Sequence, residues 1–147
     1  MKHKRGLVFI CMAAGIVIVA CLALLFSRNA TLSTMSTNWG VTFPEKTRVV
    51  EHSEEKSFHG DGYRCTILRT DAGASAENTT LDSRNFTTDT LSEASIDIIE
   101  NAQSLCSASQ FNTDDTYAHQ IISNVNGVLL IVQGQDKTTY YCFESIV

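Results

Sequence analysis

The feature that most constrains this chain is an uninterrupted apolar run, Leu7–Phe26, which reads LVFICMAAGIVIVACLALLF. The run is twenty residues long and contains neither a charged residue nor a proline. A helix rises about 1.5 Å per residue, so a helix of this length would span about 30 Å, the thickness of the hydrocarbon core of a bilayer. We therefore predict a transmembrane helix over residues 7–26, preceded by a short cytoplasmic basic tail, residues 1–6.

The charges that flank the run predict its orientation. Lys2, Lys4 and Arg5 precede it, whereas Arg28 is the one basic residue close behind it. Positively charged flanks tend to remain in the cytoplasm. We therefore expect a single-pass protein of the cell membrane, with its N-terminus in the cytoplasm and its C-terminal domain outside.

Two alternatives to an uncleaved anchor stay open. The run could be a secretory signal peptide, although it is longer than the usual apolar region of about 7–15 residues and lacks a good cleavage site. Ile18–Cys21 (IVAC) also resembles a bacterial lipobox, in which Cys21 would be lipidated and become the new N-terminus. All three alternatives place the rest of the chain outside the cytoplasm.

The part of the chain behind the run is acidic. It contains eight Lys and Arg and all sixteen Asp and Glu, so it carries a formal charge of −8. Binding to phosphate groups depends on Lys and Arg. The charge therefore argues against nucleic acid as a partner, and against anionic lipid or anionic wall polymer.

The cysteines leave the disulfide state open. Cys11 and Cys21 lie in the run, where cysteine is a small apolar residue. Cys65, Cys106 and Cys142 lie beyond it. Three cysteines in an oxidising compartment form at most one internal disulfide and leave one thiol, and in a host that makes few disulfides all three would be buried thiols.

The exported part divides into a polar segment and one domain. Residues 27–42 are rich in Ser, Thr and Asn and nearly uncharged, which predicts a polar stalk. Within it, Trp39 could lie at the membrane interface or pack onto the domain, and its distance from the apolar run favours the second. Residues 43–147 are enough for one extracytoplasmic α+β domain with a modest core.

The pattern of this domain predicts about five strands in a small antiparallel sheet, packed against one main helix. The order is two strands, a loop, the helix and three strands. The expected strands are Lys46–His52, Tyr63–Leu68, Tyr117–Val125, Val128–Gln133 and Thr138–Phe143, and the expected helix is Leu91–Ser107.

Three local signals refine this prediction. Thr90 followed by Glu93 fits a capping box at the start of the helix. Asn126-Gly127 is a strong signal for a two-residue hairpin turn. Val128–Val132 is apolar at every position, which predicts a central strand covered on both faces.

The candidate binding residues lie in the string Phe-His-Gly-Asp-Gly: His59, Gly60, Asp61 and Gly62. The two glycines around an aspartate fit a tight turn, with Asp61 bonded to its own backbone. In a functional interpretation, the glycines present backbone N–H groups to an anion, and His59 acts as an acid, a base or a ligand. The string lacks the length and the lysine of a phosphate loop, and no predicted helix directly follows it, which favours the structural turn.

The sequence gives no basis for a catalytic residue, a metal site or a cofactor. The metal donors have no recognised zinc spacing, and no Gly-x-Ser-x-Gly nucleophile motif occurs. The available donors are His52, His59, Asp61, Cys65 and His119. The carboxylate pairs Glu54-Glu55 and Asp114-Asp115 fall in predicted polar loops.

Three pieces of the chain resemble a group of small membrane-anchored or exported proteins of Gram-positive bacteria with a Phe-His-Gly-Asp-Gly motif. They are Phe43-Pro44, Phe58–Tyr63 and Thr139–Glu144. The resemblance implies the location and a fold, and it supplies no activity. The three exported cysteines are not part of the pattern, so it implies no disulfide.

Together these observations favour a non-catalytic module that binds or senses something at the cell envelope. The partner would be an envelope protein, a peptide or a cell-wall component. One alternative is a small envelope enzyme or metal site centred on His59 and Asp61. Another is an immunity or accessory protein that acts through its membrane segment.

Overall fold

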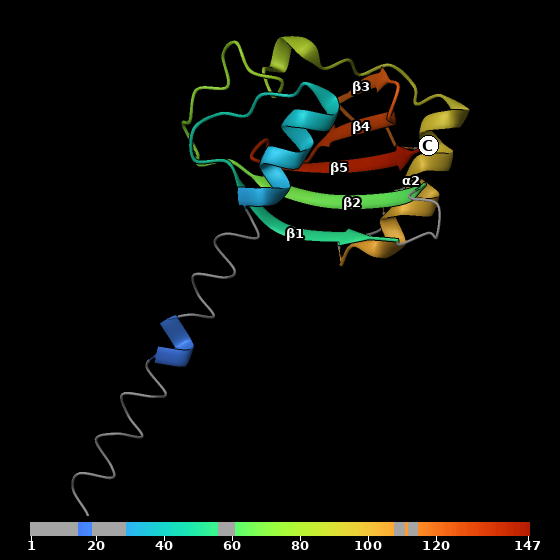
Figure 1. Ribbon diagram of the computed structural model, residues 1–147. Helices are drawn as coiled ribbons and strands as arrows, with labels where there is room; N and C mark the ends of the chain where they lie inside the picture. Colours follow the sequence, from blue (N-terminus) through green and yellow to red (C-terminus); the bar gives the residue numbers. More distant parts are fainter. Residues whose placement is uncertain (1–14, 19–28, 56–60, 108–110, 112–114) are drawn as a thin grey trace, which may run out of the picture.

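The computed structural model describes residues 15–18, 29–55, 61–107, 111 and 115–147, and its centre is a five-stranded antiparallel sheet (Figure 1). The strands lie in the order β1-β2-β5-β4-β3, and every neighbouring pair is antiparallel. The predicted α+β class and strand succession are confirmed. The strands are β1 (Arg48–Glu54), β2 (Gly62–Arg69), β3 (His119–Asn124), β4 (Gly127–Gln133) and β5 (Thr139–Ile146).

The predicted helix covers one face of the sheet. It is α2 (Glu93–Ala102), continued by a short 3-10 turn, η2 (Gln103–Leu105). Its buried side includes Ile98 and Ile99, which pack against the sheet. The predicted capping box is wrong, because Ser92 caps the helix by accepting a hydrogen bond from the backbone N–H of Ser95. Leu91, which was predicted as the first helical residue, lies before this cap, and its side chain is buried.

The other face is covered by a helix that the sequence did not lead us to expect. Residues 29–39, within the segment predicted as a stalk, are helical, and Met35 and Trp39 lie in the core beneath them. In Figure 1 this helix (cyan) crosses in front of the sheet, and α2 lies behind it. The packing of Trp39 onto the domain is confirmed. The folded unit therefore includes this helix and does not start at residue 43.

Strand β4 shows how the two helices share the sheet. Leu129 and Ile131 contribute to the core below helix 29–39, and Leu130 and Val132 contribute to the core below α2. All four side chains are fully buried. The expectation that this strand is covered on both faces is confirmed, and the domain has three layers: helix, sheet and helix.

The hairpin between β3 and β4 turns one residue earlier than predicted. Asn124 pairs with Gly127, so the two turn residues are Val125 and Asn126. Gly127 has a φ of 126°, and a Cβ atom there would lie 2.0 Å from the carbonyl oxygen of Ser145. Glycine is needed at this position because strand β5 passes so close to it.

The structure settles the disulfide state that the sequence left open. Cys65 of β2 is bonded to Cys106, which follows η2, and Cys142 of β5 is free and buried. The bond joins the sheet to the end of the helical segment that covers it. This is the alternative with one internal disulfide and one remaining thiol.

Most of the apolar run over residues 7–26 lies outside the described residues, and residues 15–18 are helical. In the part of the chain that the structure describes, no helix has both the length and the apolar character needed to cross a membrane. The transmembrane helix accordingly stays a prediction from the sequence.

Replacing Trp39 should destabilise the domain. We expect Trp39→Ala to lower the free energy of unfolding by about 3–5 kcal/mol, because it removes a large buried side chain and its hydrogen bond. Urea unfolding of the full chain in a mild detergent, followed by circular dichroism, measures the change. Ser33→Ala, an exposed position on the same helix, is the control, and an equal effect of both variants would contradict the docking of this helix.

The disulfide should contribute measurably to stability. Its cysteines are 41 residues apart in the sequence, so we expect the double variant Cys65→Ala/Cys106→Ala to lose about 2–4 kcal/mol of unfolding free energy. A reducing agent should destabilise the wild-type protein in the same urea assay. The reducing agent should leave the double variant unchanged, and a wild-type protein insensitive to reduction would contradict the bond.

Candidate functional site

Three charged side chains form a row across neighbouring strands, which we call the acidic row: Glu54, Arg64 and Glu144. Glu54 of β1 pairs with Arg64 of β2, and Arg64 pairs with Glu144 of β5. Residues directly opposite each other on antiparallel strands point to the same face of the sheet. The pairing of the strands therefore brings together two carboxylates that are far apart in the sequence.

Glu144 is the most deeply buried member of the acidic row, with 2 % of its surface exposed. Its Oε2 atom accepts a hydrogen bond of 2.7 Å from Nε1 of Trp39, on helix 29–39. Burial raises the pKa of Glu144, while the Trp39 hydrogen bond and the charge of Arg64 act in the opposite direction. The net shift is upward, so the surroundings do not fully replace the water that an ionised carboxylate loses.

Arg64 lies between the two carboxylates and is closer to the outer one. Its Nε atom is 3.3 Å from Oε2 of Glu54, and its Nη1 atom is 4.0 Å from Oε2 of Glu144. The second distance is too long for a direct hydrogen bond. Arg64 therefore forms its closer ion pair with Glu54. Its interaction with Glu144 is a longer-range electrostatic attraction.

A second row beside the acidic row contains His52, Thr66 and Cys142, again on β1, β2 and β5. The Nδ1 atom of His52 lies 2.8 Å from Oγ1 of Thr66. Burial lowers the pKa of His52, the charge of Glu54 raises it and that of Arg64 lowers it further. The net shift in the pKa of His52 is downward, which favours the neutral imidazole.

The acidic row and His52 form the floor of a hollow whose roof is helix 29–39, and we call this hollow the helix pocket. Its volume is about 260 Å³. It contains a carboxyl group with a raised pKa and an imidazole with a lowered one, a combination common at functional sites. The lining residues are Ala30, Thr31, Thr34 and Met35 from the helix, and His52, Glu54, Arg64 and Glu144 from the sheet.

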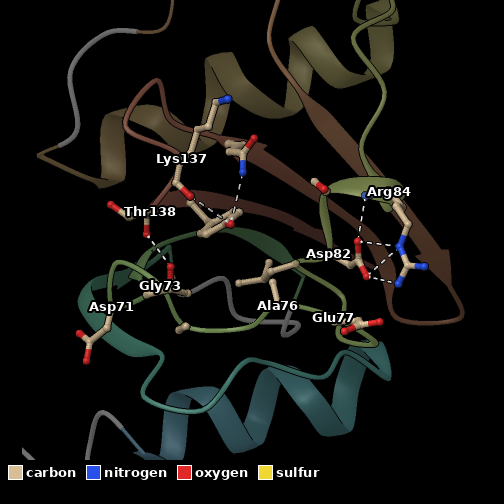
Figure 2. Close-up of a pocket in the computed structure, with 14 residues that line it drawn as sticks. Asp71, Gly73, Ala76, Glu77, Asp82, Arg84, Lys137 and Thr138 are labelled. Atoms are coloured by element: carbon tan, nitrogen blue, oxygen red, sulfur yellow. Dashed lines mark hydrogen bonds and ion pairs between the residues drawn. The ribbon is translucent and has the colours of Figure 1, made fainter.

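A larger and more open hollow lies beside the loop that follows β2 (Figure 2). Its volume is about 520 Å³. Figure 2 shows Asp82 and Arg84 at its wall, with their charged groups turned toward each other. Asp82 bonds the guanidinium and the backbone N–H of Arg84, and also the backbone N–H of Asn78.

The hydrogen bonds from Arg84 hold the pKa of Asp82 well below its usual range. These two charges pair with each other, and the hydrogen bonds that Asp82 accepts from Arg84 and Asn78 fix the loop. We therefore take the helix pocket, and not this hollow, as the candidate site.

Of the four binding residues predicted from the Phe-His-Gly-Asp-Gly string, the structure describes two. His59 and Gly60 lie outside the described residues, whereas Asp61 and Gly62 lie at the start of β2. Gly62 has a φ of 143°, and a Cβ atom there would lie 3.0 Å from the carbonyl oxygen of Glu55. Gly62 thus has a structural role in the β1–β2 hairpin, and the binding role of the string stays a prediction.

The other predicted metal donors are dispersed. His52 lies in the helix pocket, Cys65 is in the disulfide, and His119 is buried on β3 with its Nδ1 atom 3.0 Å from the carbonyl oxygen of Tyr117. Among the residues with described positions, no three His, Cys, Asp or Glu side chains are grouped to hold a metal ion.

Glu144, Arg64 and the hydrogen bond between Trp39 and Glu144 were not predicted from the sequence. One signal for Glu144 was present in β5. Alternation along this strand places Tyr140, Cys142 and Glu144 on one face. A carboxylate that continues a buried face is unusual, because it needs a partner there.

Comparisons of the chain with protein-family models, with curated proteins and with solved structures found no match. The candidate site is therefore defined by its geometry alone.

Removing the charge of Glu144 should change how stability depends on pH. Because the pKa of Glu144 is raised in the folded state, the wild-type protein should lose stability as the pH rises from 4.5 through that pKa. Glu144→Gln lacks this loss, so its stability relative to wild type should increase between pH 4.5 and pH 8. Urea unfolding across this range measures it. Glu77→Gln, at an exposed position, should not reproduce the change, and a constant difference between Glu144→Gln and wild type would contradict the buried charge.

Proposed function

We propose that this chain is a single-pass envelope protein whose domain lies outside the cytoplasm and binds or senses a small polar molecule in the helix pocket, without catalysis. The observation that carries the proposal is the position of this pocket. Its roof is helix 29–39, which lies close in sequence to the end of the apolar run at Phe26. Its floor is the acidic row on the sheet.

The disulfide supports the location outside the cytoplasm. Bonds such as Cys65–Cys106 form and persist in oxidising compartments and are rare in the cytosol. The basic residues before the apolar run favour the same orientation. The two arguments are independent, because one concerns redox chemistry and the other concerns membrane insertion.

The way helix 29–39 is docked supports a sensing role. A molecule in the helix pocket would contact both the helix and the sheet, which are joined by the hydrogen bond between Trp39 and Glu144. A ligand that binds the docked arrangement better than an undocked one shifts the population toward it. Binding in the pocket would thus change how tightly helix 29–39, which follows the predicted anchor in the sequence, is docked on the sheet.

The chemistry of the pocket supports binding over catalysis. The Cys142 thiol lies in the row beside Glu144, although it is not among the described residues that line the pocket, and its pKa is raised by burial and by the charge of Glu144. It therefore stays protonated and is a poor nucleophile. The Nδ1 atom of His52 is engaged with Thr66.

Protease treatment of intact cells that produce the full chain, tagged at its C-terminus, tests the location. We expect the domain to fractionate with membranes and to be degraded by the added protease, because it lies outside the permeability barrier. A cytoplasmic protein of the same cells must stay intact as the control. A domain that is protected in intact cells, or that is free in the soluble lysate, would contradict the proposal.

A further inference from the structure

We propose that the outer edge of strand β3 binds the same edge of a second copy of this chain, so that the sheets of the two copies join into one continuous antiparallel sheet. The inference concerns an interface between copies and does not depend on the helix pocket. It is derived from the backbone hydrogen bonds of β3, from its lack of charge and from the symmetry of the pairing.

The two edges of the sheet differ in how they are protected. β1 forms one edge and β3 the other (Figure 1). The register of β1 shifts between Val49 and Glu51, and the strand contains the charged residues Arg48, Glu51 and Glu54. Bulges and charged side chains keep edge strands from pairing with another chain. β3 has neither device, because it pairs with β4 without a register shift and contains no Asp, Glu, Lys, Arg or Pro.

The hydrogen bonds of β3 alternate between its two sides, as they do in any antiparallel sheet. On one side, the backbone N–H of Gln133 on β4 donates to the carbonyl oxygen of Ala118 at 2.8 Å. On the other side, the next residue, His119, exchanges two backbone hydrogen bonds with Thr87. The even-numbered residues of β3 therefore bond β4, and the odd-numbered residues direct their backbone groups outward.

The outer side of β3 is paired only at its start, where Thr87 bonds His119. Within the described part of the chain, no hydrogen bond is made by the backbone N–H or carbonyl groups of the next two outward residues, Ile121 and Ser123. The side chain of Ile121 is also 45 % exposed. These two residues thus offer two donors, two acceptors and an apolar side chain to a further strand.

The free groups are complementary to those of a second copy. Two β3 strands can pair antiparallel so that Ile121 of each copy lies opposite Ser123 of the other, with Ile122 of both copies at the centre. Residues that exchange two hydrogen bonds alternate with residues that exchange none. In this register, every free N–H and carbonyl of Ile121 and Ser123 finds a partner, and the residue that Thr87 already bonds is not needed.

The side chains are compatible with this pairing on both faces. The Ile122 side chains of the two copies would lie directly opposite each other, on the face that helix 29–39 covers. The Ile121 side chains would be diagonal neighbours on the α2 face, because Ile121 pairs with Leu130, which lies in the core below α2. Although the part of the chain behind the apolar run is acidic, no like charges would meet at this edge.

The symmetry of the pairing favours a second copy over an extended segment of another protein. Antiparallel neighbours are related by a two-fold axis perpendicular to the sheet, so helix 29–39 of both copies would lie on the same face of the joined sheet. The predicted anchors, which precede these helices in the sequence, would then lead from the same face, as two copies in one membrane require. A foreign segment would gain the backbone hydrogen bonds without this symmetry.

Sedimentation equilibrium of the full chain in a density-matched detergent tests the association. We expect the wild-type protein to dimerise reversibly. Ser123→Pro should raise the dissociation constant by about tenfold or more, because it removes an outward N–H from each copy and no hydrogen bond to β4. Ser123→Ala keeps the N–H and should dimerise as the wild-type protein does.

A second variant keeps the test decisive if Ser123→Pro folds poorly, which urea unfolding would reveal. Ser123→Lys retains the backbone N–H and places a charge on the edge of each copy, as naturally protected edge strands do. It should also weaken the dimer, and its unfolding free energy should stay close to that of the wild-type protein, because Ser123 is exposed.

Cysteine cross-linking tests the register. In a chain that carries Cys11→Ala and Cys21→Ala, mild oxidation should link two copies of Ile122→Cys. Directly opposite residues that do not bond each other have Cα atoms about 4.5 Å apart, within reach of a disulfide. Asn124→Cys is the control, because its two copies would be displaced by about 14 Å along the strands. It should run as a monomer on a non-reducing gel.

The proposal is overturned if the wild-type protein is monomeric, which would leave the edge to an extended segment of another protein. It is also overturned if Ser123→Pro and Ser123→Lys both associate as strongly as the wild-type protein, or if Asn124→Cys cross-links as readily as Ile122→Cys. These outcomes concern the β3 edge alone. The location outside the cytoplasm is decided separately by the protease experiment.

Discussion

The hydrogen bond between Trp39 and Glu144 is the interaction on which the rest of the structure depends. It connects helix 29–39 to the central strand β5 over a distance of 2.7 Å and satisfies one oxygen of a carboxylate that has almost no access to water. Without this donor, burial of Glu144 would be far more costly. Without Glu144, the indole N–H would lie in the core without an acceptor. Each residue supplies the hydrogen-bond partner that the other needs in the core, and together they fix the helix over the sheet.

The two faces of the sheet have different roles. The face below α2 is apolar and is held by the Cys65–Cys106 disulfide, so it supplies rigidity. The face below helix 29–39 combines an apolar core with the acidic row at one side. β5 is the central strand of the sheet, and its successive side chains point to opposite faces. Phe143 packs toward α2, and Glu144 points toward the pocket. A rigid face behind a polar one is a suitable base for a binding site.

The sequence predicted the sheet well because its signals are local and periodic. The apolar stretch of β4 and the alternation in β5 depend on residues that are neighbours in the chain. Helix 29–39 was missed because Leu32, Met35 and Trp39, which recur at helical spacing, are embedded in a segment rich in Ser and Thr.

The candidate site was missed for a different reason. Glu54 and Glu144 come together through the register of three strands, which the sequence pattern does not give. The Phe-His-Gly-Asp-Gly string was predicted as a binding site because its residues are contiguous in the sequence.

The geometry of Glu144 also determines how a ligand would act on the helix. A ligand that favours the ionised form of Glu144 would strengthen its hydrogen bond to the indole N–H of Trp39, because a charge-assisted hydrogen bond is stronger than a neutral one. Ligand binding and helix docking would then reinforce each other, because each stabilises the same charge state. Such coupling is reciprocal: whatever holds the helix against the sheet also increases affinity for the ligand. With the anchor that the sequence predicts over residues 7–26, the N-terminal end of the helix would be the point at which that coupling is transmitted.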